Sequence, residues 1–189
     1  MKRPLEDVFA AAERASSLAL GPGLGREPDR QALVRRLLVE TDLPAVVDAD
    51  GLFGLTPFQR RAPTVLTPHA GELGRLLAQP SSWVDSHRLE AVSQAADLFG
   101  CVCLLKGADT LVAAPGEGVL VADAGPPSLA VAGTGDVLTG TIAAFLAKGM
   151  EARLAAAAGA VACGAAASLG PRRGLVASDV VARLPEVLP

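Results

Sequence analysis

Aromatic residues and lysines are scarce in this sequence. Among its 189 residues there is no tyrosine and one tryptophan, and aromatic residues make up 3% of the chain. The stacked aromatic platforms that bind single-stranded nucleic acids are therefore excluded. The net charge is −3, and the basic residues, nearly all arginine, form no run. This balance provides no electrostatic surface for DNA, RNA or an anionic membrane.

Cysteine and long hydrophobic runs are also scarce. The three cysteines, Cys101, Cys103 and Cys163, are odd in number and form no C-x-x-C pair, so we expect buried free thiols and neither a zinc site nor a disulfide framework. The longest uncharged run, 154–170, consists mostly of alanine and glycine and predicts a buried helix, not a membrane span. Acidic residues stand where a signal peptide needs apolar ones, and the bias toward arginine over lysine is typical of a bacterial genome rich in G and C. We therefore expect a bacterial cytoplasmic protein.

Apolar residues are abundant, at 50% of the chain, and the length suits one domain with a real core. Short apolar runs alternate with helical patterns, which is typical of an α/β fold with a mostly parallel central sheet flanked by helices. We therefore expect one domain over residues 1–189. The expected strands are 17–20, 45–47, 64–66, 101–105 and a hairpin of 111–114 with 119–121. The expected helices are 29–40, 70–77, 136–148 and 151–168. Two more helices are expected, one that Asp85 caps and that ends at Phe99, and one that Ser178 caps. Residues 80–83 are expected to form a loop.

Two sequence patterns follow the first two expected strands. The glycine-rich turn Gly21–Gly25 allows close approach of a ligand to the backbone, or is simply a tight strand-to-helix turn. Asp48 and Asp50 come directly after the next strand, at the sheet edge where open α/β folds bind ligands. Either carboxylate would hold a metal-bound phosphate or a substrate hydroxyl, or would cap the following turn.

Two further patterns follow the next two strands. His69 and Glu72 begin a helix, where they would orient a substrate or serve only as cap and first-turn acid. Lys106, in a chain poor in lysine, follows a buried strand, and with Thr110 it suits a phosphate or nucleotide; simple solvation of the strand end is the alternative. The second histidine, His87, lies in a predicted amphipathic helix and is expected at the solvated surface.

The most specific pattern is Gly133-Thr134-Gly135-Asp136 at the start of a helix. Backbone N–H groups there point at an anion, aided by the helix dipole. Asp136 beside such an anion hole suits a base that takes a proton from a substrate hydroxyl, although it would also serve as a helix cap. The phosphate loop G-x-x-x-x-G-K-[ST], the G-x-S-x-G elbow, H-E-x-x-H and the kinase catalytic loop are absent.

In this order, the motifs resemble the ADP- or ATP-dependent NAD(P)H-hydrate dehydratases of the ribokinase-like superfamily. The resemblance covers nearly everything from Leu18 onward. It rests on the segments GPGLG (21–25), DADGL (48–52), LTPHAGE (66–72), LLKGADT (104–110), AGTGDVLTG (132–140) and RGLVASD (173–179).

This resemblance implies a carbon–oxygen lyase that repairs NADHX or NADPHX, with ADP or ATP as co-substrate. Gly23, His69 and Asp136 match positions that contact the hydrated nicotinamide nucleotide, and Asp136 matches the catalytic position. The adenine nucleotide site matches Lys106, Gly107, Ala108, Asp109 and Thr110, together with Gly133, Thr134 and Gly135. Mg²⁺ would be bound by the nucleotide phosphates, with no direct protein ligand.

The sequence departs from the family pattern at its N-terminal end and at two internal positions. The family domain has a further glycine-rich segment and strands before the part that matches, so we expect an exposed sheet edge. Either a partner covers that edge or the fragment is compromised. The segment 126–130 reads Pro-Pro-Ser-Leu-Ala where relatives have Asn-Pro-Gly-Met-Ala, and Ala70 replaces a common proline.

Two other functions remain open: a ribokinase-like kinase of a small hydroxylated molecule, and an inactive nucleotide-binding fragment. Small-molecule nucleotides, a homo-oligomer and an association with an NAD(P)HX epimerase are the expected partners.

Overall fold

The computed structural model describes residues 5–188 and places six strands in one sheet with the order β1-β2-β3-β4-β5-β6. The strands β1 to β4 run parallel, and β5 and β6 return as an antiparallel hairpin on β4. Their bounds are β1 Leu18–Leu20, β2 Ala45–Val47, β3 Thr64–Leu66, β4 Val102–Leu105, β5 Thr110–Ala113 and β6 Leu120–Ala122. The expected α/β class with a mostly parallel sheet is therefore confirmed.

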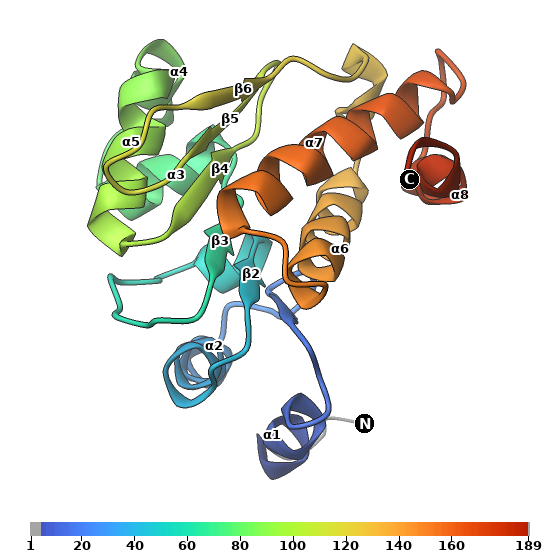
Figure 1. The fold of residues 1–189 in the computed structure, drawn as a ribbon. Helices are drawn as coiled ribbons and strands as arrows, with labels where there is room; N and C mark the ends of the chain where they lie inside the picture. The colour runs from blue at the N-terminus through green and yellow to red at the C-terminus, as the bar shows by residue number, and fades with distance from the viewer. Residues whose placement is uncertain (1–4, 189) are drawn as a thin grey trace.

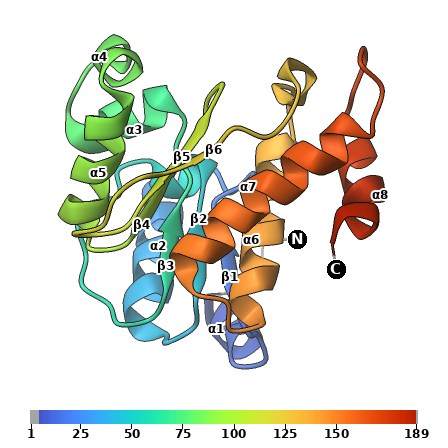
Figure 2. The same ribbon diagram turned by 45° about the horizontal axis from the view of Figure 1, so that its top comes forward.

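Helices cover both faces of the sheet, as Figures 1 and 2 show. One face packs against α6 and α7, and α8 packs on these two helices. The helices α3, α4 and α5 cover the other face near β4 and β5 (Figure 1). The bounds are α1 Leu5–Ala12, α2 Pro28–Glu40, α3 Ala70–Leu77, α4 Ser81–Ser86, α5 Arg88–Phe99, α6 Thr134–Ala147, α7 Ala152–Ser168 and α8 Ala177–Val187, with 3₁₀ turns η1 Ala49–Leu52 and η2 Pro127–Leu129.

Alternation along the central strands divides the core into two layers. In β4, Leu104 joins the cluster under α6 and α7, while Cys103 and Leu105 join the cluster under α3 and α5. In β2, Val46 likewise faces α6, and its neighbours face α2. Because successive side chains of a strand point to opposite faces, burial on both sides requires the unbroken apolar runs of this sequence.

Three predictions about helices are wrong. Residues 81–83, expected as a loop, begin α4, because Val84 is fully buried and draws this turn onto the core. Asp85 consequently lies exposed inside α4, and α5 begins only after His87. Ser178 lies inside α8; the backbone N–H at its start, that of Val176, donates to Asp179 (3.0 Å).

The first helix, α1, is not among the predicted elements. Its residues Phe9 and Ala12 pack with Leu33 and Leu37 of α2 in a small outer cluster.

Two expectations about single residues are confirmed. All three cysteines are buried and free, and His87 is exposed and stacked on Trp83. Within residues 5–188, the helices are too short or too polar to cross a bilayer.

Candidate functional site

Polar side chains from the carboxyl ends of three adjacent parallel strands meet at one edge of the sheet. Asp48 follows β2, Glu72 lies on α3 just after β3, and Lys106 follows β4. Nζ of Lys106 lies 2.6 Å from Oδ1 of Asp48 and 3.9 Å from Oε2 of Glu72. Both carboxylates are almost fully buried, whereas the lysine side chain is 24% exposed. Of these three side chains, only that of Lys106 therefore has substantial access to solvent.

His69 and Glu72 form a reciprocal cap at the start of α3. Nδ1 of His69 accepts from the backbone N–H of Gly71 (3.0 Å) and of Glu72 (3.4 Å), and Oε2 of Glu72 accepts from the backbone N–H of His69 (2.9 Å). Because Nδ1 is an acceptor here, the neutral ring carries its proton on Nε2, which lies 3.5 Å from Oε1 of Glu72. The cap therefore fixes the orientation of the imidazole.

The first turn of α6 lies next to the group formed by Lys106, Asp48 and Glu72, which we call the lysine cluster. A Cβ atom built at Gly135 would lie 3.6 Å from both Oδ2 of Asp48 and Nζ of Lys106. Gly133 precedes the helix with φ 87°, a left-handed conformation that favours glycine, and no side chain among residues 5–188 caps the helix. The N–H group of Thr134 donates to the carbonyl of Val131 (3.4 Å), and those of Gly135 and Asp136, with the positive end of the dipole, suit the binding of an anion. Asp136 is exposed in the same turn.

A cavity of about 840 Å³ opens beside this turn. Polar groups from Lys106, Thr110 and Thr134 lie on its wall, and Leu138 with Cys163 contributes apolar lining. Its volume is within the usual range for a ligand-sized site. The sequence-predicted residues that line the cavity are His69, Lys106, Gly107, Ala108, Thr110, Thr134 and Gly135.

The other predicted residues lie outside the lining of this cavity. Asp48, Glu72, Gly133 and Asp136 adjoin it in the lysine cluster or at the start of α6. Asp109 is exposed, and its carbonyl accepts from Nη2 of Arg88 (2.6 Å).

The glycine-rich turn is held in place by Asp50. This carboxylate accepts from the backbone N–H of Gly25 (3.1 Å) and from Nε of Arg26 (2.7 Å). The hydrogen bond from Arg26 lowers the pKa of Asp50, and the one from Gly25 acts in the same direction against partial burial. Gly21 packs so closely on η1 that a Cβ there would meet backbone atoms of Asp48 and Gly51. Asp50 therefore fixes the conformation of this turn. Within the turn, Gly23 is exposed and has a φ of 64°.

Several residues of the site carry no role in the sequence-based interpretation. Thr139 donates to Oδ2 of Asp48 (2.9 Å), although the sequence shows it only as one position of a helical motif. Arg88 packs against Gly107 and donates to the carbonyl of Asp109 in the 106–110 loop. Residues of the segment 124–131 and Cys163 also line the cavity. No sequence pattern signals these contacts, because each joins segments far apart in the chain.

The segment that departs from the family pattern forms part of the cavity wall. Its residues Pro127–Leu129 form η2. Oγ1 of Thr134 donates to the carbonyls of Leu129 (2.9 Å) and Val131 (2.8 Å), which ties the segment to the start of α6.

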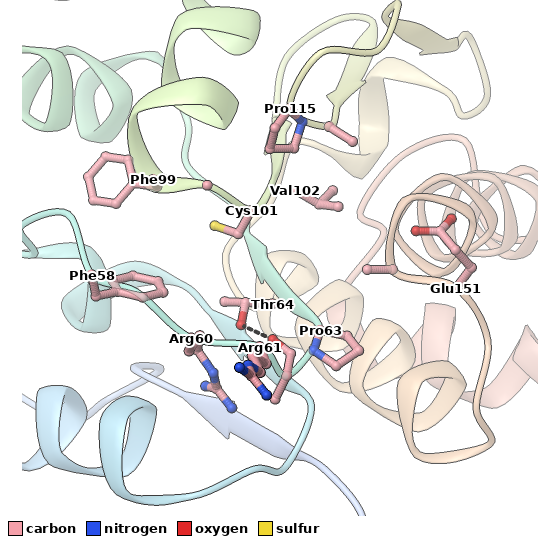
Figure 3. A pocket seen from close by; sticks show the side chains of 14 residues that line it. Phe58, Arg60, Arg61, Pro63, Thr64, Phe99, Cys101, Val102, Pro115 and Glu151 are labelled. Atoms are coloured by element: carbon pink, nitrogen blue, oxygen red, sulfur yellow. Dashed lines mark hydrogen bonds between the residues drawn. The ribbon is translucent and has the colours of Figure 1, made fainter.

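A second, smaller cavity of about 220 Å³ lies at the opposite end of the parallel strands. Figure 3 shows Phe58, Phe99, Arg60 and Cys101 around it. Nη2 of Arg60 donates to the carbonyls of Thr41 and Leu43, so this guanidinium binds the end of α2. None of the predicted site residues lies here.

Within the described residues, no group of three His, Cys, Asp or Glu side chains is arranged to hold a metal ion. The buried carboxylates Asp48 and Glu72 are already engaged by Lys106, Thr139 and the His69 cap.

Comparison with known proteins gives consistent matches over nearly the whole chain. The Carb_kinase family, described as NAD(P)H-hydrate dehydratase, matches residues 2–186. The bifunctional NAD(P)H-hydrate repair enzyme Nnr of Salinibacter ruber is 40% identical over 97% of this chain, and that of Moorella thermoacetica is 43% identical over 97%. The chain spans only 35% and 36% of the lengths of these two relatives.

Solved structures share the fold. The ADP/ATP-dependent NAD(P)H-hydrate dehydratase from Bacillus subtilis, co-crystallized with ATP/Mg²⁺, has a TM-score of 0.85 and 32% identity, and the match covers 91% of this chain and 63% of that one. A ribokinase-like superfamily protein from Enterococcus faecalis has a TM-score of 0.77 at 23% identity, over 96% of this chain and 66% of that one. The second likeness concerns the fold alone.

Proposed function

This chain belongs to the NAD(P)H-hydrate dehydratase family, and from that premise we propose that its strand-end site dehydrates NADHX or NADPHX with ADP or ATP as co-substrate. The observation that carries the proposal is the position of Lys106. Its ammonium lies within 4 Å of two buried carboxylates, next to the first turn of α6, and lines the large cavity. A cation and a helix N-terminus on one cavity wall suit nucleotide phosphates.

The nucleotide would occupy the cavity beside the 106–110 loop. Lys106, Gly107, Ala108, Asp109 and Thr110 would surround it together with the segment Gly133–Gly135. The apolar lining at Leu138 and Cys163 suits the flat face of a base. The dehydratase from Bacillus subtilis co-crystallized with ATP/Mg²⁺ supports a nucleotide of this kind.

Mg²⁺ would enter with the nucleotide. Lys106 offsets only part of the charge on a bare polyphosphate, and the remaining phosphate charges repel one another. A divalent cation on the phosphates reduces that repulsion and stabilises charge during phosphoryl transfer.

The hydrated nicotinamide would bind toward Gly23, His69 and Asp136. Asp136, exposed at the start of α6, takes the proton of the ring hydroxyl while that oxygen attacks the terminal phosphoryl group, whose bond to the leaving nucleotide breaks. N–H groups around Gly133–Gly135 stabilise the charge on the transferring group. The ring nitrogen lone pair then expels inorganic phosphate, and loss of a proton from the adjacent ring carbon restores the dihydropyridine.

The test is dehydration of NADHX by the purified 189-residue chain, followed by the absorbance of NADH, with MgADP, MgATP or no nucleotide. Recovery of NADH that requires one nucleotide supports the dehydratase and identifies the co-substrate. A stable phosphorylated product would instead indicate a small-molecule kinase. If the folded chain is inactive while a version extended at its N-terminus is active, the family function holds and the extension contributes to the site.

We also propose that residues 1–189 act as one domain, since a single sheet connects its layers, and that the chain works in an assembly. The outer edge of β1 pairs with no strand among residues 5–188, and Ala19 on this strand is exposed. Unpaired edges of this kind favour association. A second copy of the chain and an NAD(P)HX epimerase are the proposed partners; the relatives named bifunctional support the latter.

A further inference from the structure

Asp48 is the most deeply buried charged group at the site, and its carboxylate is fully engaged. Oδ1 accepts from Nζ of Lys106 (2.6 Å) and from the backbone N–H of Ala49 (2.8 Å), and Oδ2 accepts from Thr139 (2.9 Å). Its exposed fraction is 1%. A buried carboxylate with both oxygens occupied has no remaining access to a ligand, so any role of Asp48 must act through its partners.

The partner that reaches the cavity is Lys106. An ammonium has three N–H donors, and the bond to Asp48 uses one of them. Glu72, at 3.9 Å, lies beyond hydrogen-bond distance. Lys106 therefore keeps donors for a ligand in the cavity while its bond to Asp48 remains intact.

Thr139 departs from the ordinary behaviour of a buried helical threonine. Two residues along the same helix, Thr141 donates to the carbonyl of Val137 one turn earlier (2.8 Å), which is the usual local bond of such a hydroxyl. Thr139 instead crosses to Asp48, 91 positions away in the chain. This bond joins α6 to the end of β2 at the point where Lys106 is held.

The placement of Lys106 also needs an electrostatic explanation. A cation close to a helix N-terminus is unfavourable, because that end of the dipole is positive. Nζ nevertheless lies beneath the first turn of α6, near Gly135. The carboxylate of Asp48 offsets this repulsion, so two sources of positive potential are kept together on the cavity wall.

We infer that Asp48 is a positioning residue of the nucleotide site: with the Thr139 hydroxyl, it holds the Lys106 ammonium beneath the first turn of α6, where a nucleotide phosphate meets a fixed cation. The identity of the ligand rests on the proposed function. The immobilisation of Lys106 does not, so the two are tested by separate measurements.

The first measurement uses the scarcity of lysine. The chain has three lysines, Lys2, Lys106 and Lys148, so a protein labelled with ¹³C at lysine Cε gives few NMR signals, and Lys106→Arg assigns one of them. In the wild type, the two Hε protons of Lys106 should have distinct shifts, as in a fixed side chain. They should merge in Asp48→Asn and Thr139→Val and stay distinct in Thr139→Ser, which keeps the hydroxyl. Merged protons in the wild type overturn the inference.

The second measurement is calorimetric binding of MgADP and MgATP. Loss of a hydrogen bond to a charged group should raise Kd about 10- to 100-fold in Asp48→Asn and about 3- to 10-fold in Thr139→Val, with recovery in Thr139→Ser. Thr64→Val is the matched control, because Thr64 is a buried threonine that donates to the carbonyl of Ala62 at the opposite end of the parallel strands, and it should change Kd less than about twofold.

Three outcomes separate the possibilities. Wild-type affinity in a folded Thr139→Val overturns the inference and leaves the proposed function intact. An equal loss in Thr64→Val would show that replacement of any buried threonine weakens binding, and it overturns the inference as well. Absence of nucleotide binding by the wild type counts against the proposed function. The NMR measurement still decides whether Asp48 fixes Lys106.

Discussion

Glu72 and His69 cap each other: Oε2 of Glu72 accepts from the backbone N–H of His69 at 2.9 Å, and Nδ1 of His69 accepts from the backbone N–H of Glu72 at 3.4 Å. The imidazole thus serves the helix and, with Nε2 near the cavity, would also serve a substrate. The two roles are separable by mutation, because asparagine caps a helix well and lacks the ring.

His69→Ala should lower the free energy of unfolding by about 0.5–2 kcal/mol, because the cap is lost. His69→Asn should change the free energy of unfolding by only a few tenths of a kcal/mol, because asparagine also caps a helix. If the ring also contacts the nicotinamide nucleotide, both variants should raise the KM for NADHX. Urea unfolding and steady-state kinetics on the same preparations make the comparison. An unchanged KM in the stable asparagine variant would leave His69 with the capping role alone.

Asp136→Asn keeps the shape of the side chain and removes the proposed base. Turnover of NADHX should fall by roughly two to four orders of magnitude, the usual scale for loss of acid–base catalysis. Nucleotide affinity should change little, because the backbone N–H groups of the turn remain. Asp85→Asn, an exposed aspartate on α4, is the control, and near wild-type turnover of Asp136→Asn would exclude the residue as the base.

Lys106→Ala should weaken the binding of MgADP or MgATP by about 10- to 100-fold, the scale expected when a charged hydrogen-bond donor is lost. The matched control is Lys148→Ala, at the exposed end of α6. Isothermal calorimetry measures both. The substitution also leaves Asp48 buried without its counter-ion, so the free energy of unfolding must be measured in parallel. Equal affinities of the two variants would place Lys106 outside the nucleotide site.

The sheet was predictable because its signal is local. The runs 45–47 and 64–66 are short and mostly apolar, each follows a proline and is followed by a polar residue, and each becomes a strand with the predicted bounds. The helix 70–77 is also as predicted. The break between α4 and α5 was not predictable, since it depends on Val84 reaching a core that other segments build.

The site was predictable only in part, for the same reason. Parallel strands bring Asp48, Glu72 and Lys106 together, because residues at the carboxyl ends of adjacent strands share one edge. The bond from Thr139 to Asp48 and the contact of Arg88 with the 106–110 loop arise from packing between distant segments. A single sequence holds no signal for such pairs.

Asp50 should contribute stability that depends on pH. Its hydrogen bond from Arg26 lowers its pKa below the ordinary 3.8, so the folded state favours the carboxylate. The contribution of Asp50 to stability is therefore fully present above the pKa that this carboxyl has in the unfolded chain. It is lost as the pH falls through the lower pKa that the carboxyl has in the folded protein.

We expect Asp50→Asn to lower the free energy of unfolding by about 0.5–1 kcal/mol at pH 7, a value typical of an exposed pair. The difference from the wild type should shrink as the pH falls toward about 3, because the unfolded chain takes up this proton near the ordinary pKa of 3.8 and the folded carboxylate does so only below that value. Urea unfolding across this range measures it, with Asp85→Asn as the control. A difference that stays constant down to pH 3 would mean that Asp50 acts by shape and not by charge.

The cysteines provide a probe of the cavity. Burial raises the pKa of Cys101 to about 12 and also raises those of Cys103 and Cys163. The thiolate is the reactive form, so a disulfide reagent at neutral pH should react with the folded protein slowly, through transient opening, and with the unfolded protein at once.

Cys163 lines the large cavity, and Cys101 lines the small cavity at the opposite end of the strands. A ligand that binds only the closed form slows opening of its own site in proportion to its excess over Kd. Saturating MgADP or MgATP should therefore slow the labelling of Cys163 by at least about tenfold and leave local labelling of Cys101 little changed. The rates are measured on two double variants, Cys101→Ala with Cys103→Ala and Cys103→Ala with Cys163→Ala, which keep only Cys163 and only Cys101, respectively. Equal protection of both would show that the nucleotide suppresses only global unfolding, and no protection of Cys163 would place the nucleotide elsewhere.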